Sequence, residues 1–148
     1  MAVQIGARPD SGFDDPIGML KDCHRRIESF LGILCVVVNR AQGRGLSDEE
    51  RDAIKAALQY FRTGGQRHTA DEEESLFPRL RKSNATYFEE IDRLEGDHHE
   101  ASNLHGTVEQ LYSDHIQVEE TIVFARAIQV LDSYAIAAIG TEFRFRRK

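Results

Sequence analysis

Apolar residues recur at alternating steps of three and four along most of this 148-residue chain, and this spacing constrains the fold more than any other feature. Residues three and four apart share one face of an α-helix, so the spacing places an apolar stripe along each of four helical segments. No stretch shows the sustained alternation of a half-buried strand. The spacing therefore predicts an all-α bundle. The predicted inward positions include Leu20, Ile27, Leu31, Val38, Leu58 and Ile122.

Capping signals mark where three of these segments begin, and Thr86 with Glu89 offers a capping box for the third. Asp15 can cap the first segment, and Pro16 suits its first helical position. Ser47 and Glu50 form a capping box at the start of the second segment. Pro78 is expected to kink the second segment or nearly end it, because proline lacks the N–H that a helix interior needs.

A twelve-residue pattern occurs twice in the chain. Residues 68–79 read HTADEEESLFPR and residues 115–126 read HIQVEETIVFAR, and the two share a His, two Glu, a Phe and an Arg at matching places. The first and third segments repeat more faintly, since MLKDCHRRI at 19–27 aligns with RLEGDHHEA at 93–101. The chain is therefore a doubled helix pair, in which one helix carries a His at the matching inward place and the next carries His-x-x-x-Glu.

Six polar residues interrupt the apolar stripes at inward positions: His24, His68, Glu72, His98, His115 and Glu119. Burying a carboxylate is costly unless it is paired or bound to a cation, so two inward Glu, each one turn beyond an inward His, indicate a metal site. Side chains four residues apart on a helix can reach one point. Imidazole binds iron, zinc, copper or nickel, and a carboxylate can bridge two ions. The pattern predicts a two-metal site.

With these motifs the chain resembles the hemerythrin-like HHE cation-binding domains over roughly residues 14–145, and HTADEEESLFPRL is the most specific part of the resemblance. The resemblance implies an up-down-up-down four-helix bundle. It also implies that the six inward His and Glu residues are ligands of a non-haem centre of two iron ions, joined by an oxo or hydroxo bridge.

The resemblance divides the chain into three parts. Residues 1–13 are expected to form an N-terminal extension, residues 14–132 the metal-binding bundle, and residues 133–148 a short C-terminal helix with a basic tail. We expect the basic ending FRFRRK to be a solvated tail.

One departure from the family bears on function. Oxygen-carrying invertebrate hemerythrins have a further histidine one turn after the third-helix ligand, where this chain has Ser102. Four His, two bridging Glu and a bridging oxygen leave about two positions open around two six-coordinate ions. We therefore expect the protein to bind or sense dioxygen or a related small oxidant. The alternatives are a di-iron enzyme that decomposes peroxide or nitric oxide, and a metal-storage or zinc-binding bundle without redox chemistry. Glu73, His99 and His105 are further candidate ligands.

The second departure is a length difference between the two halves. His24 and His68 are 44 residues apart, whereas His98 and His115 are only 17 apart. Either the second hairpin is shortened, or segments three and four fuse into one long helix. In a fused helix His115 would lie about 25 Å from His98 and would complete a partner chain's site. A shortened hairpin would leave apolar residues at the far ends of the first two helices half uncovered, namely Leu34, Val37, Val38, Ile54 and Leu58. Either a domain-swapped long helix or packing of two exposed ends would cover them, so we expect a homodimer.

Charge and composition disfavour two classes of partner. A net charge of −6 and a pI near 5.5 argue against nucleic acid, which needs a basic surface. The longest strongly apolar run, FLGILCVVV, is too short to span a bilayer. Cys23 and Cys35 lie about 18 Å apart on one predicted helix and cannot bridge each other. Together with the absence of a signal-peptide pattern, this predicts a cytoplasmic protein with no membrane partner.

Overall fold

The computed structural model describes residues 10–83, 88–103 and 115–148, and every regular element in those ranges is helical. In chain order the elements are α1 (Pro16–Ala41), α2 (Asp48–Tyr60), η1 (Phe61–Gly65), α3 (Gln66–Asp71), η2 (Glu72–Leu76), α4 (Phe77–Ser83), α5 (Phe88–Asn103), η4 (Glu119–Val123), α7 (Phe124–Val130) and α8 (Ser133–Phe145). Residues 115–118 form the helical turn that leads into η4. The all-α prediction is confirmed for these residues, and the exact up-down-up-down order stays a prediction.

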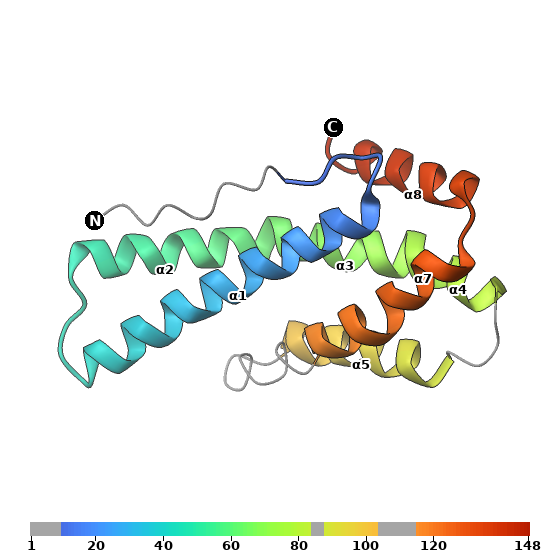
Figure 1. Cartoon of the computed structure of the whole chain (residues 1–148). Helices are drawn as coiled ribbons and strands as arrows, with labels where there is room; N and C mark the ends of the chain where they lie inside the picture. The colour runs from blue at the N-terminus through green and yellow to red at the C-terminus, as the bar shows by residue number, and fades with distance from the viewer. Residues whose placement is uncertain (1–9, 84–87, 104–114) are drawn as a thin grey trace.

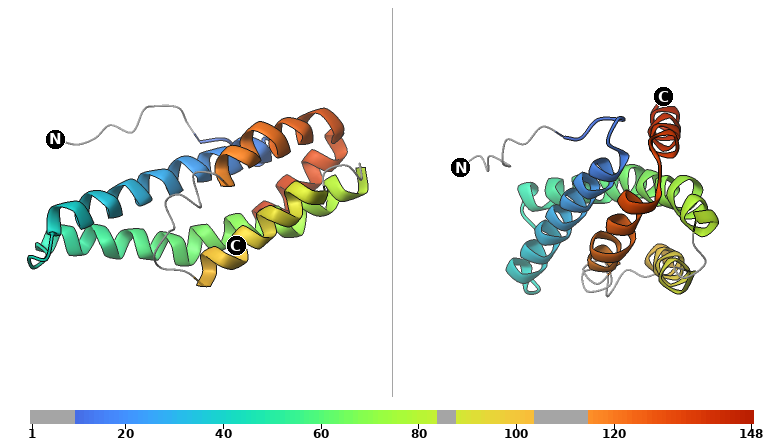
Figure 2. Two further views of the ribbon diagram at one scale, coloured as in Figure 1. Left: turned by 90° about the horizontal axis from the view of Figure 1, so that it is seen from below. Right: turned by 45° about the vertical axis from the view of Figure 1, so that its right-hand side comes forward.

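A long helical hairpin forms the frame of the bundle (Figure 1). α1 lies beside a rod made of α2, η1, α3, η2 and α4, and α5 and α7 pack against one half of this hairpin. α8 crosses the same half and contacts α1, α3 and η2. At the other end α1 and α2 extend beyond α5 and α7, as the two views of Figure 2 also show.

The caps predicted for the first two segments form as expected, while Thr86, predicted to cap the third, lies outside the described residues. The Asp15 carboxylate accepts a hydrogen bond from the Gly18 backbone N–H at 2.9 Å, which satisfies an unpaired donor of the first turn of α1. Ser47 and Glu50 form both hydrogen bonds of a capping box at the start of α2. The first two segments therefore begin where the sequence indicates.

Both copies of the repeated motif contain a π-helical turn that begins at the same Glu. The turns are η2, which starts at Glu72, and η4, which starts at Glu119. A π turn adds one residue to the helix and often marks a functional site. Pro78 is the second residue of α4, and α4 ends at Ser83. The expected kink at Pro78 stays a prediction.

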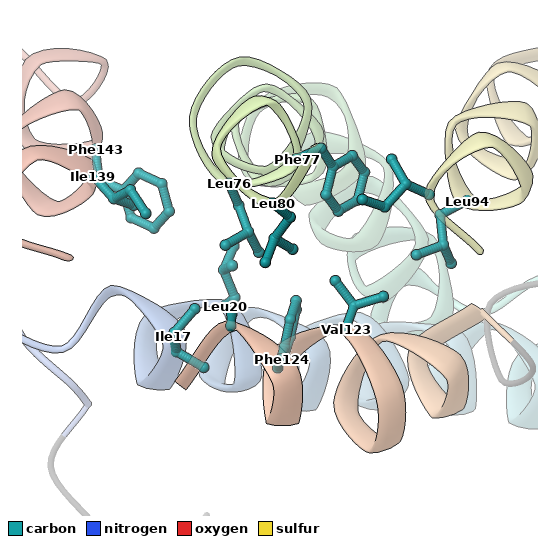
Figure 3. Packing of buried hydrophobic residues seen from close by; sticks show 12 residues of the cluster. Ile17, Leu20, Leu76, Phe77, Leu80, Leu94, Val123, Phe124, Ile139 and Phe143 are labelled. Carbon is teal, nitrogen blue, oxygen red and sulfur yellow. The ribbon is translucent and has the colours of Figure 1, made fainter. Parts of the chain in front are cut away.

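Two buried apolar clusters fill the bundle. The larger one joins α1, η2, α4, α5, α7 and α8 (Figure 3), and its members include Ile17, Leu20, Leu76, Phe77, Leu80, Leu94, Val123, Phe124, Ile139 and Phe143. The smaller one consists of Ile27, Leu31 and Ile116, with Tyr60 and Phe61 packed against it. On α1 and on the rod, the predicted metal ligands lie between the residues of the two clusters.

Three predicted inward positions are wrong. Ile122 is 39% exposed, and its neighbour Val123 is buried instead, because the π turn shifts the inward face by one residue. Val38 and Leu58 are 68% and 43% exposed. In each case the preceding residue, Val37 or Ala57, is buried instead.

The C-terminal segment is a helix, but its basic ending is not a solvated tail. Arg146 Nη1 donates to Asp71 Oδ1 at 3.0 Å, and Arg147 Nη2 donates to Asp71 Oδ2 at 2.6 Å. Asp71 is fully buried, so these two guanidinium groups supply the counter-charge that it needs. The expectation of a free tail is therefore wrong. Among the described residues, no helix has the length and apolar character required to cross a bilayer.

Candidate metal centre

All six predicted ligand residues meet at one place in the bundle. His24 comes from α1, His68 from α3 and Glu72 from η2. His98 comes from α5, His115 from the helical turn at 115–118, and Glu119 from η4. Five of the six residues are buried, and the side chain of His98 is only 6% exposed.

The third and fourth segments fold back on each other within one chain. The ring centroids of His98 and His115 are 4.5 Å apart. A continuous helix would separate these residues by about 25 Å, so the fused-helix alternative is wrong for this chain. Residues 104–114, which connect the two segments and include the candidate ligand His105, lie outside the described residues.

The six residues form two overlapping groups, each of which could hold one metal ion. The group that we call position A consists of His24, His68, Glu72 and Glu119, and position B consists of His98, His115, Glu72 and Glu119. In each group one nitrogen or oxygen atom per residue lies within 4.8 Å of the others. The two carboxylates belong to both positions.

Each carboxylate presents one oxygen to each position. Glu72 Oε1 lies 3.3 Å from His68 Nε2, and its Oε2 lies 3.3 Å from His98 Nε2. Glu119 Oε2 lies 2.8 Å from His24 Nε2, and its Oε1 lies 2.9 Å from His115 Nε2. A carboxylate that bridges two ions has this arrangement.

The nitrogen atoms at position A also have a spacing that suits a shared ion. The Nε2 atoms of His24 and His68 face each other at 3.1 Å. Two imidazole ligands of one ion, each about 2.1 Å from it and at a right angle, would be about 3.0 Å apart. Both oxygens of Glu72, like both oxygens of Glu119, are buried and have no hydrogen-bond partner in the described ranges. The donor set therefore fits a pair of cations.

Burial sets the protonation of three of these groups in the metal-free chain. Burial raises the pKa of Glu72 well above the usual 4.5, and the nearby Glu119 carboxylate raises it further. Burial lowers the pKa of His68 well below 6.5, and a charged His24 would lower it further. Burial also lowers the pKa of His98, with His115 adding to the effect. Neutral imidazoles are the form that binds metal.

Glu119 and His115 shift in the opposite directions. Burial acts to raise the pKa of Glu119, but its short contacts with His115 and His24 outweigh burial and hold this pKa low. Burial acts to lower the pKa of His115, but Glu119 and Asp97 outweigh it and raise this pKa. Glu119 thus has short contacts with histidines that stabilise its charge, whereas the histidine contacts of Glu72 are longer, at 3.3 Å or more, among the residues that the structure describes. A bound cation would supply the counter-charge that Glu72 needs.

Three imidazoles have a carboxylate behind them, on the side away from the two positions. Glu120 Oε1 is 2.9 Å from His24 Nδ1, and Glu73 Oε1 is 2.8 Å from His98 Nδ1. Asp97 Oδ2 is 3.4 Å from His115 Nδ1. Such partners fix the imidazole tautomer and orientation, so that Nε2 keeps its lone pair for a metal.

The candidate ligand Glu73 is therefore a partner of His98 and belongs to neither position. His99 is exposed and also belongs to neither. Sequence reasoning missed the roles of Asp97 and Glu120. For Glu120 a signal was present, because it is the second Glu of the repeated motif and matches Glu73 in the other copy.

The repeated Phe also has a role beside the imidazoles. Phe124 stacks on the ring of His24 with centroids 5.3 Å apart, and Phe77 stacks on the ring of His98 with centroids 6.3 Å apart. Both Phe residues are fully buried. The second motif copy therefore holds His24, and the first copy holds His98, between a carboxylate and an aromatic ring.

Comparison with known proteins agrees with this geometry. The hemerythrin HHE cation binding domain matches residues 15–127. An uncharacterized protein of Haemophilus influenzae is 29% identical over 126 residues, which cover 82% of this chain and 73% of that protein. No solved structure gives a significant match. The chain belongs to the hemerythrin HHE cation-binding domain family.

Proposed function

We propose that this protein is a cytoplasmic non-haem di-iron protein that binds or senses dioxygen or a related small oxidant. The proposed ligands are His24, His68, Glu72, His98, His115 and Glu119. The observation that carries the proposal is the pair of buried carboxylates, each with one oxygen directed to each of two histidine pairs. Membership of a cation-binding family supports it independently.

Each position offers two imidazole nitrogens and two carboxylate oxygens, a mixed donor set that suits iron. Four protein donors leave about two positions of a six-coordinate ion open, one of them for a bridging oxygen. A bound iron pair would supply one-electron chemistry toward a small oxidant. The chain supplies the enclosure, because Phe77 and Phe124 cover two of the histidines, while the cluster of Ile27, Leu31 and Ile116 packs nearby.

Metal analysis combined with optical spectroscopy tests this proposal. Protein purified without oxygen should contain two iron ions per chain and be nearly colourless, and air should develop the charge-transfer bands of a bridged diferric pair. Zinc in place of iron, or iron without these bands, would contradict redox function and support the metal-storage alternative. Rapid consumption of added peroxide or nitric oxide would support the enzyme alternative.

The exposed end of the α1–α2 hairpin supports a further proposal, that two chains form a homodimer. Of the apolar residues expected to lack cover, Val38 and Leu58 are 68% and 43% exposed, whereas Val37 is buried. Ile33 and Val36 on α1 are also exposed, at 37% and 47%. Since one chain brings both histidine pairs together, no exchange of helices is needed, and end-to-end packing is the simpler form. Light scattering at micromolar concentration should give the mass of a dimer, and Val38→Glu should give a monomer. A monomeric wild-type chain would refute the proposal.

A further inference from the structure

The two metal positions are related by an internal symmetry, and one pair of residues breaks it. We infer that Asp97 makes position B the tighter metal site, and that Cys23, at the matching place, leaves position A the weaker one. This inference rests on the proposed two-metal function, and it goes beyond it by ranking the two positions and assigning the difference to named residues outside the ligand set.

The symmetry is visible in how the motif copies support the histidines. Glu73 in the first copy contacts His98 Nδ1 at 2.8 Å, and Glu120 in the second copy contacts His24 Nδ1 at 2.9 Å. These are equivalent residues of the repeat that act on equivalent histidines. One histidine at each position therefore has a carboxylate behind it from the motif itself.

The symmetry breaks at the other histidine of each position. Cys23 and Asp97 occupy matching places, each one residue before the ligand histidine of its helix, His24 or His98. Asp97 Oδ2 lies 3.4 Å from Nδ1 of His115. The corresponding atom at position A, Nδ1 of His68, is buried and has no hydrogen-bond partner in the part of the chain that the structure describes. A thiol at residue 23 does not replace the carboxylate.

The charged residues behind the imidazoles add to the difference in metal affinity between the two positions. Glu120, the one carboxylate behind position A, is shared with the guanidinium of Arg25. The residue that matches Arg25 in the other half is His99, which lacks a permanent charge. Within the described ranges, position B thus has two carboxylates behind two imidazoles, whereas position A has one carboxylate, which is partly neutralised by an arginine.

The size of the difference in affinity can be estimated from the contribution that a carboxylate behind a metal-binding imidazole makes in other metalloproteins. A carboxylate behind a metal-binding imidazole orients the ring and makes it more basic, and its loss weakens metal binding about 10- to 100-fold. We therefore expect position B to bind a divalent ion at least about tenfold more tightly than position A. The first ion bound by the metal-free chain should enter position B.

Cobalt(II) titration of two single-position variants tests the ranking, with the visible absorption of the bound ion as the readout. His24→Ala leaves all four residues of position B, and His115→Ala leaves all four of position A. The dissociation constant of one cobalt ion should be at least about tenfold lower in the His24→Ala chain. Equal constants, or tighter binding in the His115→Ala chain, would overturn the inference.

Charge changes in these two backgrounds test the residues. Asp97→Asn added to His24→Ala should weaken cobalt binding about tenfold, whereas Asp92→Asn, a mostly exposed carboxylate on the same helix, should not change it. Cys23→Asp added to His115→Ala should tighten binding, with Cys23→Ser as the uncharged control. Unaltered cobalt binding by the Asp97→Asn chain would overturn the inference even if Cys23→Asp fails to fold.

The outcome also separates this inference from the function on which it rests. Two bound cobalt ions in the wild-type chain, with equal constants in the two single-position variants, would refute the ranking and leave the two-metal site standing. Absence of cobalt from the wild-type chain would refute the two-metal site, and the ranking with it.

Discussion

Replacing Glu72 with Gln should stabilise the metal-free protein while it weakens metal binding. Glu72 is fully buried, both of its oxygens lack hydrogen-bond partners among the described residues, and burial raises its pKa well above 4.5. Without a cation, folding at neutral pH must either bury this charge or take up a proton. Gln has nearly the same shape and no charge, so the variant avoids this cost but loses the bridging carboxylate.

The sign and the upper limit of the effect follow from linkage. A carboxyl whose pKa is raised by folding contributes its full stability below its unfolded pKa, here 4.5, and loses it as pH rises toward its folded pKa. The loss is about 1.4 kcal/mol per pH unit, so between pH 4.5 and 7.5 it reaches at most about 4 kcal/mol. About 4 °C per kcal/mol is expected for a domain of this size, so the melting temperature could rise by up to about 16 °C.

Thermal melts of chelator-treated wild type and Glu72→Gln between pH 4.5 and 7.5 measure this difference. The two melting temperatures should nearly coincide at pH 4.5 and separate as pH rises, with the variant the more stable. Glu74→Gln, in which a mostly exposed neighbouring carboxylate is neutralised, should show no such pH-dependent gain. A Glu72→Gln chain that melts below wild type at pH 7.5 would refute the reasoning that burying the charge of Glu72 is costly in the metal-free chain.

Three further predictions follow from the same contacts. Glu119→Gln should have the opposite effect and destabilise the metal-free chain by about 1–3 kcal/mol, because it removes the counter-charge of His115; a higher melting temperature would contradict this. Metal binding near pH 7 should release protons, because the raised pKa values of Glu72 and His115 favour their protonated forms, and bound ions displace these protons. Binding heats that do not depend on the ionisation enthalpy of the buffer in calorimetry would contradict this. Gly140→Ala should cost about 1–3 kcal/mol in chemical denaturation, since its Cβ would overlap the Phe13 carbonyl oxygen, whereas Gly32→Ala, with open space around it, should cost nothing.

The ligand pattern was predictable because burial leaves a distinct mark on the sequence. A Glu on an apolar stripe is rare enough to signal a cation, and the spacing of His68 and Glu72 puts both side chains on one helix face. The same pattern in His115 and Glu119 indicated that the site is doubled. The structure brings these side chains together as that spacing requires.

Features that depend on the neighbouring helix were not predictable from periodicity. The π turns at Glu72 and Glu119 shift the inward face by one residue, so regular stepping selected Ile122 where Val123 is buried. Asp97 lies on a polar stretch of α5, and only the return of the chain brings His115 beside it. The docking of the C-terminal arginines was missed for the same reason, since their buried partner Asp71 is more than 70 residues away.

The central claim, that Glu72 and Glu119 bridge two iron ions between two histidine pairs, is tested most directly by anomalous diffraction at the iron edge from crystals of the iron-loaded protein. We predict two anomalous peaks about 4 Å or less apart, one bonded to His24 and His68 and the other to His98 and His115, with both carboxylates in contact with both ions. A single peak, or two peaks not bridged by these carboxylates, would contradict the claim.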